Sequence, residues 1–259
     1  MVTLPGDVIR LMFASMADPI EPKSVLAFAA TCRFVRDSLA GKNGEMAKLR
    51  ILYEGVLALC QTMGCSCHEF RTCRGIFCPA RLSAVDIEVL ARVARSGALL
   101  QLETLEPYNS PFGPAAFSAL ASALPHLPKL TKLTLVGCAL GDESMPILAS
   151  ELKRGVLAKA TSINLGHNAI GPRGVDALCK SFDERVLPAC SEFAMYGNPL
   201  GEEGLTLIAE TLTQGSLPAL KRLNVAAGAC IDVNYSYSGA IAVLKSACDA
   251  RTAARVQLF

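Results

Sequence analysis

The chain has no surplus of charge of either sign. Its 259 residues include 25 basic and 23 acidic ones, mixed along the length, and the net charge is +2. Nucleic-acid binding needs a concentrated basic surface, which is missing here, and there is no acidic tail. We therefore expect no nucleic-acid partner.

Long apolar runs are missing as well. No segment approaches the roughly 20 uninterrupted apolar residues of a membrane helix, because Lys, Arg, Glu or Pro interrupts every stretch rich in Ala and Leu. The first residues carry Asp7 and Arg10 and have no basic start before an unbroken hydrophobic run, so we identify no secretion signal. We expect an intracellular chain, cytoplasmic or nuclear, without a membrane partner.

Three catalytic signatures are absent from the sequence: a nucleotide-binding loop, paired carboxylates near a His, and a Gly-x-Ser-x-Gly elbow. We therefore expect no enzymatic activity and no required cofactor. The hydrophobic content of 51% excludes a mainly disordered protein. A chain of this length can hold one sizeable core or two small ones.

A period of thirty residues is the clearest feature that is present. The segments that start at Leu130, Ala160, Cys190 and Leu220 align without a gap. Such a period is typical of a solenoid, in which each unit buries its apolar face against its neighbours and leaves a long surface exposed. The repeat therefore indicates binding rather than catalysis.

Each repeat predicts a short strand followed by a helix. Two columns of apolar residues alternate with a mixed column, which indicates a strand with one buried face. These columns are Leu133, Ile163, Phe193, Leu223 and Leu135, Leu165, Met195, Val225. Apolar residues three or four apart then predict helices, with stripes Met145, Leu148, Leu152, then Val175, Leu178, Phe182, then Leu205, Ile208, Leu212. A further helix is expected in residues 82–97 and a last strand in residues 255–259.

The column after each strand carries a family resemblance. It reads Cys138, Asn168, Asn198, Gly228 and is followed two residues on by an apolar residue or Cys. A buried Asn or Cys there can bind the backbone groups that are left where the chain turns away from the strand. This order resembles the leucine-rich repeat, and the long units with a full helix resemble its ribonuclease-inhibitor subclass. The resemblance implies an α/β solenoid with one short parallel strand and one helix per repeat.

The resemblance also implies a ligand-binding face, because the residues between the buried strand positions face the concave surface of such solenoids. The candidates are Lys132, Thr134, Asn164, His167, Glu192, Tyr196, Arg222 and Asn224. Tyr and Arg are frequent interface hot spots, which favours Tyr196 and Arg222. Any solvated sheet face carries such residues, so an ordinary surface remains the alternative, and no ligand is identified.

Residues 4–39 predict short amphipathic helices that are interrupted by Pro19 and Pro22. Their order of apolar anchors, with the closing Thr31-Cys32-Arg33, resembles an F-box. The resemblance implies binding to the Skp-type adaptor of a cullin ubiquitin ligase. The implied anchors are Leu4, Pro5, Val8, Ile9, Phe13, Leu26 and Cys32.

Two departures from the F-box pattern stand against this resemblance. Val35 occupies the position of the usual aromatic residue, and Glu21 with Pro22 lengthens the linker. The alternative is an ordinary helical cap, which repeat arrays need at their ends.

Between these regions lies a cluster of soft ligands: Cys60, Cys65, Cys67, His68, Cys73 and Cys78. Thiolates and an imidazole suffice for a tetrahedral zinc site. The spacings, however, lack the paired two-residue gaps of a zinc knuckle. The cluster is therefore either a zinc site or a thiol-rich connector. A catalytic cysteine has less support, since no orienting acid stands at a recognisable spacing from His68.

The sequence as a whole predicts an adaptor in three parts. Residues 1–45 form the F-box-like helical segment, residues 46–98 a helical, Cys-rich connector and solenoid cap, and residues 99–259 the solenoid. In this hypothesis the first part binds the ligase adaptor and the repeats bind a substrate protein of unknown identity. The alternative is a free-standing regulatory or inhibitory repeat protein of the ribonuclease-inhibitor or GTPase-activator type.

Overall fold

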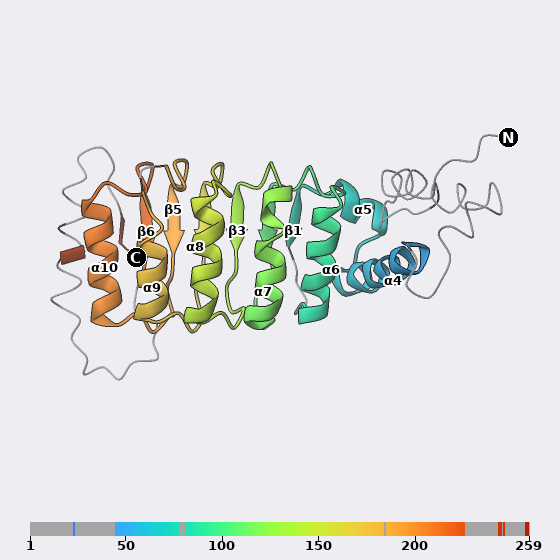
Figure 1. Ribbon diagram of the computed structural model, residues 1–259, viewed down its shortest axis with the longest axis horizontal. Coiled ribbons are helices and arrows are strands. Elements are labelled where there is room, and N and C mark those ends of the chain that lie inside the picture. The colour runs from blue at the N-terminus through green and yellow to red at the C-terminus, as the bar shows by residue number, and fades with distance from the viewer. Residues whose placement is uncertain are drawn as a thin grey trace.

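The computed structural model describes residues 23, 45–77, 81–183, 185–225, 243, 244, 246, 257 and 258. The seven anchors of the F-box-like segment, which lie between residues 4 and 32, fall outside this part, and so does Cys78. In the described part, short strands and longer helices alternate along one elongated row (Figure 1). No helix of this part is long and apolar enough to cross a membrane.

The strands and helices follow one another as the thirty-residue pattern predicts. Before the regular repeats come α4 (Glu45–Met63), α5 (Cys67–Thr72), β1 (Gly75–Phe77), α6 (Ala84–Arg95), β2 (Thr104–Glu106), α7 (Gly113–Ala121) and the short helix η1 (Leu124–His126). The repeats then comprise β3 (Lys132–Thr134), η2 (Asp142–Ser144), α8 (Met145–Lys153), β4 (Ser162–Asn164), α9 (Pro172–Cys179), β5 (Glu192–Ala194), α10 (Gly201–Thr213), β6 (Arg222–Asn224) and β7 (Gln257–Leu258).

Seven strands of the described chain form one parallel sheet, in which the order of the strands is their order in the sequence. From β3 to β6 they pair with a shift of thirty residues, so that Lys132 faces Ser162, Ser162 faces Glu192, and Glu192 faces Arg222. Each repeat therefore adds one strand beside the previous one. The strand expected in residues 255–259 is confirmed as β7, which pairs with β6.

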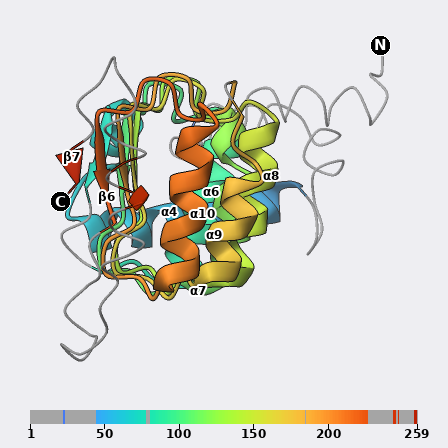
Figure 2. The ribbon, with the colours of Figure 1, turned by 90° about the vertical axis from the view of Figure 1, so that its left-hand side faces the viewer.

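The sheet and the helices form two layers, and the core lies between them (Figure 2). The middle residue of each repeat strand points into this core, and Leu133, Ile163 and Leu223 are at most 1% exposed. The helices bury Leu148, Leu178 and other stripe residues against the same core. A strand with period two and a helix with period 3.6 each direct one apolar face to one side, which produces the two layers. Phe182 departs from the predicted stripe, because α9 ends at Cys179.

The buried Asn column links each repeat to the one before it. The side-chain amide of Asn198 donates hydrogen bonds to the carbonyl oxygens of Leu165 and Met195, each at 2.8 Å, and its oxygen accepts one from the backbone N–H of Ile170 at 3.0 Å. Asn168 makes the same kind of bonds one unit earlier. The predicted role of this column, to bind backbone groups at the turn, is confirmed.

The sheet begins earlier than the sequence analysis expects. Strand β1 lies inside the segment 46–98, which was assigned to the connector and cap, and it pairs with β2. It pairs with β2 at a shift of 29 residues, and β2 pairs with β3 at a shift of 28, so β1 lies outside the thirty-residue columns, although Ile76 is buried like the other strand centres. The helix expected in residues 82–97 is confirmed as α6, and the Ser83 hydroxyl accepts a hydrogen bond from the Asp86 N–H at its start.

Candidate functional site

The face of the sheet that lies opposite the helices carries a hollow of about 200 Å³ over β4, β5 and β6. Ala194 stands in register between Asn164 and Asn224 on the neighbouring strands. Its small side chain leaves space where the neighbours carry amides, which explains why the hollow lies here. Five of the eight residues predicted for this face line the hollow: Asn164, Glu192, Tyr196, Arg222 and Asn224.

Hydrogen bonds and an ion pair hold the polar residues around the hollow in place. Glu192 forms an ion pair with Arg222 and accepts a hydrogen bond from the Ser162 hydroxyl at 3.5 Å. Asn164 donates to the Tyr196 hydroxyl at 3.5 Å, and its oxygen accepts a bond from the Gly166 N–H at 2.9 Å. Both charges of the hollow are therefore paired within the protein.

Two aromatic rings stand together at the rim of the hollow. The ring centroids of His167 and Tyr196 are 5.0 Å apart, and the rings are perpendicular. Glycines make room for both rings, because a Cβ at Gly166 would lie 2.6 Å from the Tyr196 ring and one at Gly197 would lie 2.6 Å from His167 Nδ1. His167 has a φ of +51°, which costs a residue other than glycine of order 1–3 kcal/mol. The close fit of the rings holds this pair in one arrangement.

The remaining predicted residues of this face lie outside the hollow. Lys132 forms an ion pair with Glu106 at 2.9 Å, one strand away from β4. The structure corrects the prediction for Thr134, whose side chain is only 1% exposed and lies beside Tyr108 of the preceding unit. The sequence comparison of repeats could not show this, because Tyr108 precedes the regular repeats.

Sequence reasoning missed a second aromatic pair near the other end of the sheet. Phe77 of β1 is 65% exposed, and its ring meets that of Tyr108 edge-on, with centroids 5.6 Å apart. Burial and the nearby Glu106 carboxylate raise the pKa of Tyr108. The exposed Phe77 belongs to the strand that the sequence analysis did not expect, so no signal in the sequence singled it out.

The predicted soft ligands give no metal-binding group among the described residues. No group of three or more His, Cys, Asp or Glu is placed there to hold a metal ion, and Cys78 lies outside this part of the chain. The cysteines near α4 and α5 carry free thiols. Burial raises the pKa of Cys60 and of Cys65, and it raises the pKa of Cys73 to about 11.

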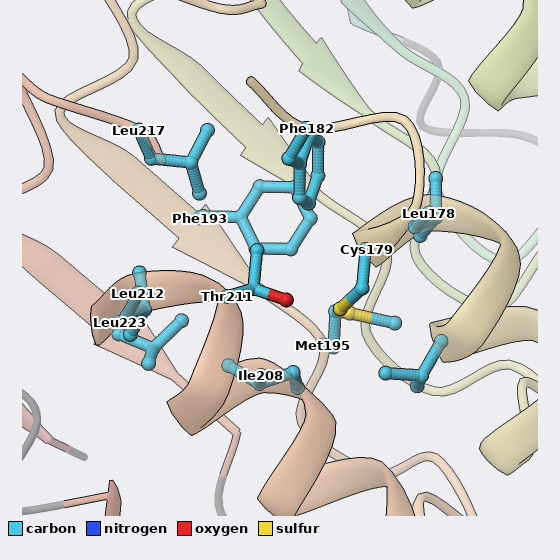
Figure 3. A pocket seen from close by; sticks show the side chains of 11 residues that line it. Leu178, Cys179, Phe182, Phe193, Met195, Ile208, Thr211, Leu212, Leu217 and Leu223 are labelled. Carbon is cyan, nitrogen blue, oxygen red and sulfur yellow. The ribbon is translucent and has the colours of Figure 1, made fainter. Parts of the chain in front are cut away.

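A small void lies inside the core between α9, α10 and β5 (Figure 3). It measures about 20 Å³ and is lined mainly by apolar side chains, among them the edge-on pair Phe182 and Phe193. The Thr211 hydroxyl is satisfied there by the Leu207 carbonyl at 2.7 Å. A void of this size holds at most one water molecule, so it is a packing feature rather than a ligand site.

Comparison with known proteins agrees with the topology. Residues 161–179 match the family model described as Leucine Rich repeat, and they span β4 and α9. One of the thirty-residue units is therefore similar to a leucine-rich repeat.

The comparisons with curated proteins and with solved structures show less than the family model does. No curated protein matches this chain in sequence. Among the solved structures that resemble this chain is one described as Leiomodin-1 Actin-Binding Site 2 (ABS2). It is 16% identical, with a TM-score of 0.49, and the match covers 64% of this chain and 88% of that one.

Proposed function

We propose that this chain is a protein-interaction module, and that a protein partner binds the open sheet face around Ala194. The observation that carries the proposal is the hollow over β4 to β6, where a small residue is surrounded by side chains that are already held in place. Preorganised side chains lose little freedom on binding, which favours affinity. A leucine-rich-repeat solenoid supports binding of this kind rather than bond chemistry.

The shape and chemistry of the hollow favour a protein over a small molecule. At about 200 Å³ it is smaller than the 300–1,000 Å³ of a usual small-molecule site. Tyr196 and Arg222 are of the residue types that anchor protein interfaces. Because Glu192 and Lys132 are paired with charges of the protein itself, we expect contacts by shape, aromatic rings and amides more than by charge.

The more specific proposal is that the chain is the substrate-recognition subunit of a cullin-type ubiquitin ligase. Its support is the order of the sequence: an F-box-like segment with anchors such as Ile9 and Phe13 precedes a leucine-rich-repeat solenoid. Such a subunit would raise the local concentration of a bound substrate near the transfer centre. The competing proposal is a free-standing regulatory repeat protein, in which the first forty residues are only a cap.

Photo-crosslinking tests the binding face in cells. A benzoylphenylalanine at Lys132, on the same sheet face one strand away from the hollow, should link to one protein, whereas the same group at Lys180, on the helix layer, should not. Excess untagged wild-type chain should compete with this product, but the variant Ala194→Arg, which fills the hollow, should not. Equal competition by wild type and Ala194→Arg would contradict the proposed face.

A separate experiment tests the ligase proposal. The full chain should capture purified Skp-type adaptor, and Ile9→Asp or Phe13→Asp should abolish the capture. Ala194→Arg serves as the matched control and should leave it unchanged. If the wild-type chain does not bind the adaptor, the ligase proposal fails, while the proposal for the sheet face is unaffected.

A further inference from the structure

Cysteines of the solenoid have oxygen partners. The thiol of Cys138 donates to the carbonyl of Pro107 at 3.2 Å, and that of Cys190 donates to the carbonyl of Glu192 at 3.3 Å. Cys73, just before β1, also donates to a carbonyl oxygen, that of Phe70, at 3.0 Å. These thiols are held by the fold as small polar groups.

Three cysteines at the junction of α4 and α5 have a different environment, because they are close neighbours. Burial raises the pKa of the Cys60 thiol, and the nearby thiols of Cys67 and Cys65 raise it further. The backbone holds this arrangement: the Cys65 N–H donates to the Cys60 carbonyl at 3.0 Å across a turn in which Gly64 has a φ of +68°. We name Cys60, Cys65 and Cys67 the thiol cluster.

Local interactions also fix the far side of the turn. The Ser66 hydroxyl accepts a hydrogen bond from the Glu69 N–H, and the Glu69 carboxylate accepts one from the Ser66 N–H at 2.7 Å. This capping box sets where α5 begins and therefore where Cys67 stands. The backbone therefore holds the three cysteines close together on one turn.

We propose that the thiol cluster is a disulfide-forming site in which Cys60 pairs with either Cys65 or Cys67. Glutathione disulfide is the oxidant. The thiolate of the half-buried Cys65 or Cys67 attacks one sulfur atom of the glutathione disulfide. This forms a mixed disulfide and releases one glutathione thiolate. The Cys60 sulfur then attacks the protein sulfur of that bond, releases the second glutathione and leaves its own proton to solvent. Two protein thiols are oxidised and one glutathione disulfide is reduced to two thiols.

Burial assigns different roles to the three thiols. Cys60 is 3% exposed, so a glutathione molecule cannot reach it first, whereas Cys65 and Cys67 are partly exposed. Cys60 instead reacts second: it attacks the mixed disulfide that has formed on Cys65 or Cys67. The product joins the end of α4 to the turn or to the start of α5.

Peptide mass spectrometry tests the proposal, because cleavage after Arg50 and Arg71 places all three cysteines in one peptide. After treatment of the folded chain with glutathione disulfide and alkylation, this peptide should lack two hydrogens and carry one alkylated cysteine. Cys65→Ser and Cys67→Ser should each keep the loss of two hydrogens. Cys60→Ser should abolish it, and so should the double variant Cys65→Ser with Cys67→Ser, in which the buried Cys60 is intact. Cys138→Ser is the control and should behave as wild type.

Two results would overturn the proposal. One is a loss of two hydrogens that persists in Cys60→Ser, because the outer thiols would then pair without Cys60. The other is one tightly bound zinc ion per chain that Cys60→Ser releases, which would assign the same thiols to a metal site.

Discussion

The interior repeats and the amino-terminal cap secure their helix starts in different ways. In the interior, α9 begins at Pro172 after Gly171, and no side chain of its own caps it. Asp142 of the preceding repeat does so instead, and its Oδ1 accepts hydrogen bonds from the Gly171 N–H at 2.6 Å and the Gly174 N–H at 2.9 Å. In the cap, α5 and α6 are each capped by a serine immediately before their first residue.

This difference shows which parts of the chain depend on their neighbours. An interior repeat leaves backbone groups that only the adjacent repeat can satisfy, through Asn198 and Asp142. Helices α5 and α6 satisfy their first N–H groups within one turn of the chain. We therefore expect a substitution in the interior to weaken two units together and a substitution in the cap to act locally.

The largest effect is expected for Asn198→Ala. The Asn198 side chain is 5% exposed, and its loss takes this partner from the Ile170 N–H and the Met195 carbonyl. The Leu165 carbonyl keeps a hydrogen bond from Asn168. We expect the free energy of unfolding to fall by about 3 kcal/mol, since each unsatisfied buried group costs about 1–3 kcal/mol and some will reach water. Urea denaturation followed by circular dichroism measures this change.

The matched control for this substitution is Asn198→Cys, which copies the residue that the chain itself uses at Cys138. A thiol fills most of the volume and can donate to a carbonyl, as Cys138 does toward Pro107. We expect about half of the loss that alanine causes. Equal losses for the two variants would mean that hydrogen bonding at this column does not stabilise the repeats.

The next largest effect is expected for Asp142→Ala. It removes the acceptor for two N–H groups at the start of α9, and the loss of such a cap lowers the free energy of unfolding by about 1–2 kcal/mol. Asp142→Asn keeps an oxygen at the same place and should lose less than half as much. If both variants lose the same amount, the carboxylate acts through its charge rather than as a cap.

A smaller and local effect is expected for Ser83→Ala in the cap. It removes the hydroxyl that accepts a hydrogen bond from the Asp86 N–H, at a cost of about 1 kcal/mol. Hydrogen exchange should become faster at the amides of α6, while those of α9 keep their protection. Faster exchange in α9 as well would show that the cap is coupled to the interior.

The regular part of the fold could be predicted because the same physical pattern occurs in every unit. Leu133, Ile163 and Leu223 have one environment, so the sequence identifies the strand centres without knowledge of the fold. Strand β1 is offset from β2 by 29 residues and β2 from β3 by 28, so β1 does not align with the thirty-residue columns. The capping of α9 by Asp142 could not be predicted either, because Asp142 and Gly171 are 29 positions apart.

The candidate site was predicted in its composition but not in its shape. The alternation of strand residues indicated that Glu192, Tyr196 and Arg222 share a face. The hollow depends on the small Ala194 and on a tyrosine ring that rests over Gly166, and both require the positions of adjacent strands. The burial of Thr134 by a residue of an irregular unit has the same cause.

The smallest effect is expected for Arg222→Gln on the open sheet face. The side chains of Arg222 and Glu192 are 57% and 40% exposed, and such surface pairs contribute about 0–1 kcal/mol, less at high salt. We expect urea denaturation of this variant to differ from wild type by less than about 0.5 kcal/mol at any ionic strength. A loss as large as that of Asp142→Ala would show that this face stabilises the solenoid. A small loss would mean that side chains on this face can be changed without unfolding the repeats. A weaker photo-crosslink in the Arg222→Gln variant would then be due to a lost contact with the partner.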